Sequence, residues 1–67
     1  MGISSLSDVV TLYVAALRRA VHQLTDGREP AEIEAAAQEL EELDPDHPAI
    51  PALYERVRES RARAYLH

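Results

Sequence analysis

The chain contains no cysteine, no tryptophan and no phenylalanine, and all seven of its basic residues are arginine. Without cysteine, the 67 residues have neither disulfides nor thiolate metal ligands, which often support folds of this size. Three tyrosines are the only aromatic residues, so large side chains for a core are scarce. A chain this short buries only roughly 60% of the surface that its unfolded form exposes, which leaves regular helix packing and self-association as the expected supports.

The chain also has few basic residues relative to acidic ones and no long apolar run. The formal net charge is -5, and an acidic chain is a poor candidate for binding nucleic acid, where phosphate neutralisation provides much of the affinity. No apolar stretch reaches the roughly 18 residues that a membrane span requires. Residues 1–8 have no basic residue ahead of an apolar block, so no secretory signal is expected there. These features predict a cytoplasmic protein without a membrane partner.

The residues that are present favour helix, because alanine, leucine, glutamate and arginine dominate. Pro30 suits the first turn of a helix, and Gly27 suits a helix end because glycine adopts positive φ without strain. Residues 44–48, DPDHP, form the clearest break, and the next helix begins at Pro48 or at Pro51. The prediction is a single all-α domain over residues 1–67, an antiparallel hairpin plus a third helix, completed by oligomerisation. The expected helices cover about residues 6–25, 30–43 and 49–65.

The first expected helix has more apolar surface than one neighbour would cover. One set of residues has the alternating spacing of a packed helical seam and is expected mainly in the core: Leu6, Val10, Tyr13, Leu17, Ala20 and Leu24. A second set widens the apolar arc to about half of the circumference: Val9, Leu12, Val14, Ala16 and Val21. Either the other two helices cover the whole arc, or part of it meets a second chain. The candidate interface residues are those of the second set, although a dimer could also use the first.

The polar residues form no recognisable catalytic constellation. His47 lies beside Asp44 and Asp46, but aspartates in a turn usually form local hydrogen bonds, so a structural role is expected. The acidic residues that follow position 38 are expected to form a solvated face. There is no glycine-rich phosphate loop and no nucleophile with a placed base. No catalytic, cofactor-binding or metal-binding residue is therefore predicted, and no small-molecule substrate is evident.

Residues 36–48, AAQELEELDPDHP, resemble the end of a tetratricopeptide repeat and its turn into the next repeat. With Pro45 placed on the repeat's terminal proline, Leu17, Val21 and Leu24 stand near positions where that family usually has tryptophan, glycine and tyrosine. The resemblance implies a protein-binding scaffold without catalysis. A weaker resemblance, carried by Gln38, Glu39 and Leu40, is to the two-helix phosphatases of sporulation phosphorelays.

The sequence therefore predicts a non-enzymatic helical module that binds protein and associates with itself. One alternative is a small acidic regulator that sequesters a partner, as antitoxin-like or anti-factor proteins do. Another alternative is an accessory phosphatase-like hairpin of a phosphorelay.

Overall fold

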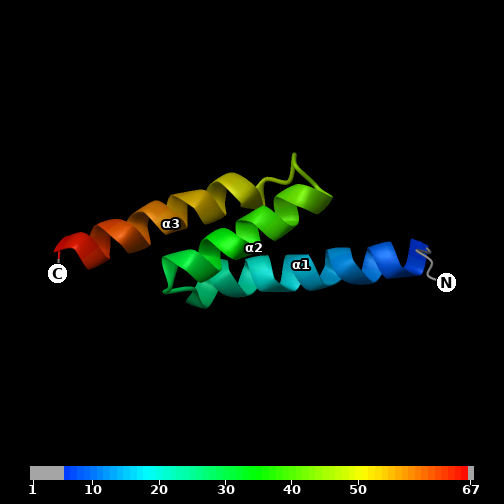
Figure 1. Cartoon of the computed structure of the whole chain (residues 1–67), viewed down its shortest axis with the longest axis horizontal. Coiled ribbons are helices and arrows are strands. Elements are labelled where there is room, and N and C mark those ends of the chain that lie inside the picture. Colours follow the sequence, from blue (N-terminus) through cyan, green and yellow to red (C-terminus); the bar gives the residue numbers. More distant parts are fainter. Residues whose placement is uncertain (1–5, 67) are drawn as a thin grey trace.

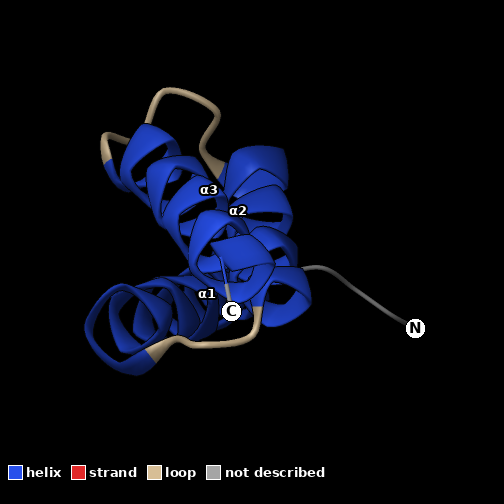
Figure 2. Cartoon of the chain, turned by 90° about the vertical axis from the view of Figure 1, so that its left-hand side faces the viewer, coloured by secondary structure: helices blue, strands red, loops and turns tan. Residues whose placement is uncertain are grey.

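The computed structural model describes residues 6–66, and the side chains of residues 7–65. It contains three α-helices, α1 (Leu6–Asp26), α2 (Pro30–Leu43) and α3 (Ala49–Leu66), and each helix contacts the other two. The all-α prediction is confirmed, and the helices begin and end within one residue of the expected positions. In the end-on view, α1 lies beside the pair that α2 and α3 form (Figure 2).

The two turns are closed by backbone hydrogen bonds. The Glu29 carbonyl accepts from the amides of Glu32 and Ile33, both at 3.0 Å, which opens α2 directly at Pro30. At the other end of α2, the Asp44 amide donates to the Leu40 carbonyl at 2.7 Å. These bonds satisfy groups that a helix end would otherwise leave without partners.

The start of α3, which the sequence left open, is fixed by His47. Its Nδ1 accepts a hydrogen bond from the Ala49 amide at 3.0 Å, and its carbonyl accepts from the Ile50 amide at 3.1 Å. The helix therefore begins immediately after Pro48, and Pro51 lies within its first turn. His47 thus has the role of a helix cap, a role usually taken by serine, threonine, aspartate or asparagine.

Gly27 ends α1 for a different reason from the one expected. Its φ lies outside the left-handed region, so positive φ is not what requires glycine here. A Cβ at this position would lie 2.3 Å from the carbonyl oxygen of Gln23, which accepts the Gly27 amide at 3.0 Å. The turn requires glycine because the chain passes too close to the last turn of α1 to admit a side chain.

The buried core runs between all three helices. Its largest fully buried side chains are Ile33, Leu40 and Leu53. Among the described side chains of α1, the fully buried ones are the small residues Ala16 and Ala20. Small residues let α1 approach α2 closely, since little side-chain volume separates the two backbones. Tyr13, Leu17 and Leu24 are partly buried against this core, as expected.

Two expectations for α1 were wrong. Ala16, predicted at an interface with a second chain, is completely buried inside its own chain. Val10, predicted in the core, is 54% exposed. The physical reason is that α1 turns its alanines, rather than its valines, toward the neighbouring helices. The side chain of Leu6, also expected in the core, lies outside the described residues.

The helices are staggered along their length (Figure 1). The molecule measures 50 × 20 × 17 Å, whereas a helix of 21 residues, such as α1, is about 31 Å long. The extra length arises because the beginning of α1 extends past α2 at one end and the last turns of α3 extend past the α1–α2 turn at the other. Both extensions leave helix surface without a neighbour from the same chain.

Candidate interaction surface

An apolar row runs along the side of α1 that its own chain leaves open. Val10, Val14 and Val21 are 54%, 42% and 57% exposed, and Leu17 between them is half-buried. Their spacings of four, three and four residues place them on one face of the helix. We call Val10, Val14, Leu17 and Val21 the outer stripe.

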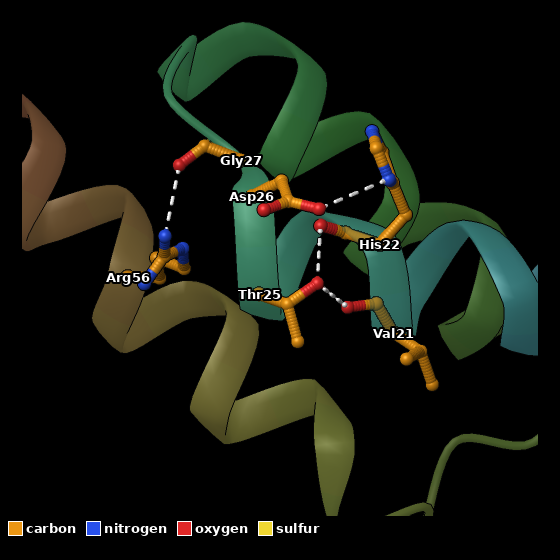
Figure 3. Close-up of polar contacts among 6 residues, drawn as sticks. All are labelled: Val21, His22, Thr25, Asp26, Gly27 and Arg56. Atoms are coloured by element: carbon orange, nitrogen blue, oxygen red, sulfur yellow. Dashed lines mark hydrogen bonds and ion pairs between the residues drawn. The ribbon is translucent and has the colours of Figure 1, made fainter.

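A shallow hollow lies along the second half of this stripe, between Val14, Leu17 and Val21. Its rim includes Thr25, whose hydroxyl donates to the carbonyls of Val21 and His22 at 3.0 and 3.2 Å (Figure 3). Because this hydroxyl is bonded back into its own helix, the threonine adds little polarity to the rim. The hollow therefore offers an apolar floor to a partner side chain.

Val9 and Leu12 form a separate apolar patch. They are 51% and 57% exposed, and they precede Tyr13, whose hydroxyl is bonded to Asp44 just after the end of α2. Of the predicted interface residues, four are thus exposed, but they divide between two surfaces, with Val14 and Val21 on the outer stripe. The sequence reasoning missed Val10 as part of this stripe, although the spacing of Val10, Val14, Leu17 and Val21 was a signal for it.

The opposite side of α1 is fixed to its own chain by polar contacts. The Tyr13 hydroxyl donates to Asp44 Oδ2 at 2.8 Å, and this hydrogen bond, together with partial burial, raises the pKa of Tyr13. The Arg19 guanidinium donates through Nε to Glu39 Oε1 at 2.7 Å and through Nη2 to Glu39 Oε2 at 2.5 Å. This two-point hydrogen bond lowers the pKa of the Glu39 carboxyl. These contacts determine which face of α1 meets α2, and so which face is left open.

The contact between α2 and α3 has a similar polar margin. The Tyr54 hydroxyl donates to Glu41 Oε1 at 3.2 Å, and the pKa of Tyr54 is raised by partial burial and by this hydrogen bond. Arg61 forms an ion pair with Glu34 at 3.2 Å. Glu41 and Glu34 of α2 therefore each bind a side chain of α3.

The described residues contain no cluster of side chains placed to bind a metal ion. No group of three histidine, aspartate or glutamate side chains in residues 7–65 is placed to hold a metal ion. His47 uses its Nδ1 to cap α3, and His22 forms a surface pair with Asp26 at 3.8 Å (Figure 3). None of the helices, over the residues described, is long and apolar enough to cross a membrane.

A wider hollow near the α1–α2 turn is lined by groups of both signs. Arg56 Nη2 donates to the Gly27 carbonyl at 3.0 Å (Figure 3). Ser60 Oγ donates to the Arg28 carbonyl at 2.7 Å. These bonds hold the middle of α3 on the turn. With arginines and carboxylates interleaved around it, this hollow selects neither an anion nor a cation.

The comparisons with known proteins assign no family to these surfaces. No family model matches the chain, and neither a known curated protein nor a solved structure matches it.

Proposed function

We propose that this protein is a non-enzymatic helical interaction module that associates with a second copy of itself through the outer stripe of α1. The single observation that supports this most is the row of exposed apolar residues along a helix whose other face is already buried. Contiguous apolar surface of this kind usually marks a protein-binding site. The turn over residues 43–48 supports the same proposal, since the tetratricopeptide family that it resembles consists of protein-binding scaffolds.

A second copy fits this stripe because the stripe is self-complementary. In an antiparallel pair of α1 helices centred between Val14 and Leu17, Val10 of one copy faces Val21 of the other. The same pairing brings Val14 of each copy against Leu17 of its partner, so the valines close over the shallow hollow. Such a pair is isologous, with the same patch used on both subunits. One helix face is a small interface, so we expect dissociation constants in the micromolar range or weaker.

The test is the molar mass in solution as a function of concentration, by sedimentation equilibrium, for the wild type and for Val21→Glu. The substitution places a charge within the proposed contact, opposite Val10 of the other copy, and we expect at least tenfold weaker association with unchanged helix content. Gln38→Glu is the control, because it adds the same charge at an exposed position of α2. A wild-type chain that is monomeric at all concentrations, or a Val21→Glu chain that associates as tightly as the control, would overturn the proposal.

A second candidate, the small acidic regulator, is favoured by the carboxylates that remain unpaired within the chain. Between residues 29 and 46 there are eight acidic residues and no basic one. Glu42 and Asp46 in particular make no hydrogen bond or ion pair with any described residue. A basic protein that binds the wild type but not a Glu42→Gln/Asp46→Asn variant would support this candidate.

A further inference from the structure

The end of the molecule that carries the start of α1, which we call the head, leaves one side of that helix without a neighbour. Every described side chain before Tyr13 is exposed, and the Tyr13 hydroxyl is bonded to Asp44, just after the end of α2. Val9 lies seven residues before the buried Ala16, so the two residues point in the same direction along α1. At the head, the side of α1 that faces the core at Ala16 is therefore exposed to solvent.

The opposite end, which we call the tail, repeats this arrangement on α3. Among the described side chains of α3, Arg61 is the last with a bond to another helix, and the side chains of residues 61–65 are all exposed, Tyr65 at 90%. Ala64 lies seven residues after Val57, which is 3% exposed. At the tail, the side of α3 that is buried at Val57 is therefore exposed, because no other helix of the chain covers it there.

Residues 61–65 of the tail are basic, whereas the end of α2 and the turn that follows it, at the head, are acidic. At the head, Glu42 and Asp46 have no bonding partner among the described residues, and the turn and the end of α2 contain no arginine. At the tail, Arg63 likewise has no partner among residues 7–65, and no acidic residue follows Glu59. An approach of tail to head is thus favoured by charge, whereas head to head and tail to tail are disfavoured.

We infer that the tail of one copy binds the head of the next, with Ala64 and Tyr65 of α3 packed on Val9 and Leu12 of α1. The stagger gives the two ends the shape of a step, so that each tail supplies the helix that the next head lacks (Figure 1). The contact is heterologous, since it joins two different surfaces, and it leaves a free head and a free tail on every assembly. Each extension is only about 10 Å long, so the contact is weak and forms short, reversible chains.

This inference is independent of the outer stripe, and its test is made on Val21→Glu chains to remove that contact. A head variant adds Val9→Glu and a tail variant adds Ala64→Glu, both at exposed positions, with helix content checked by circular dichroism. We expect the Val21→Glu parent to form concentration-dependent oligomers and each blocked variant alone to stay monomeric. An equimolar mixture should give a 1:1 heterodimer, because one variant keeps its tail and the other keeps its head.

The outcomes separate the two proposals. A mixture that stays monomeric while the parent associates, or a head variant that associates by itself, would overturn the head-to-tail contact. A Val21→Glu parent that is monomeric at millimolar concentration would also overturn it, without affecting the outer stripe. Equal association of the wild type and the parent would instead reject the stripe and leave the head-to-tail contact standing. Added salt should weaken the mixed dimer, since Arg63 meets carboxylates there.

Discussion

Leu40 and Leu43 of α2 form a matched pair for testing how the fold is held together. Leu40 is completely buried, whereas Leu43, one turn later, is 39% exposed. Replacing a buried leucine with alanine costs about 3 kcal/mol, from lost transfer free energy and the cavity left behind. Leu43→Ala removes the same atoms from a half-open position, where the loss is about 1 kcal/mol.

The difference of about 2 kcal/mol between the two variants is a substantial fraction of the stability expected for 67 residues, about 3–10 kcal/mol. For Leu40→Ala we therefore expect the midpoint of thermal unfolding to fall by about 12–24 °C, and for Leu43→Ala by about 4–8 °C. Circular dichroism at 222 nm, at a concentration below self-association, follows both transitions. Equal losses for the two variants would refute the reasoning, because they would mean that Leu43 is as well covered as Leu40.

Three further predictions concern the polar contacts and the α1–α2 turn. The pKa of Tyr13 is raised above its ordinary value of 10.0, so its contribution to stability is present below pH 10 and lost as the pH rises through the folded-state pKa. Tyr13→Phe should therefore lose less stability than the wild type between pH 9 and 11, measured by thermal unfolding. The pKa of Glu39 is lowered from 4.5, so its contribution is present above that pH and lost as the pH falls through the folded-state pKa. The stability difference between the wild type and Glu39→Gln should accordingly shrink in acid, and a constant difference would contradict the contact with Arg19. Gly27→Ala should destabilise the fold by about 1 kcal/mol or more in urea titration, because its Cβ would collide with the Gln23 carbonyl; an unchanged midpoint would show that the turn can relax.

The positions of the helices could be predicted from the sequence because their boundaries have local causes. Pro30 opens α2, Gly27 closes α1, and the prolines of the second turn stop α2. These signals act within a few residues, so no knowledge of the rest of the chain is required. The start of α3 was less certain because its cap is a histidine, which is not among the preferred capping residues.

The face of α1 that is buried could not be predicted in the same way. Two apolar rows lie side by side on this helix, one through Ala16 and Ala20 and the other through Val10 and Val14. Hydrophobicity favours the valines, but close packing against α2 favours the alanines, and packing decides. The width of the apolar arc did indicate that α1 has more apolar surface than its own chain covers. In the structure, the exposed apolar residues of α1 lie on the outer stripe and on the head.

The order in which the helices pair has a consequence for folding kinetics. The most extensive packing joins α1 to α2 and α2 to α3, which are neighbours along the chain, whereas α1 and α3 touch least. Contacts that are mostly local close short loops, and helical proteins of this kind fold within microseconds to milliseconds. The bonds from Arg56 and Ser60 to the carbonyls of the α1–α2 turn span 29 and 32 residues, so they are expected to form after the hairpins. Fast folding would shorten the time for which the apolar residues of α1 are exposed in an unfolded chain, and so limit aggregation.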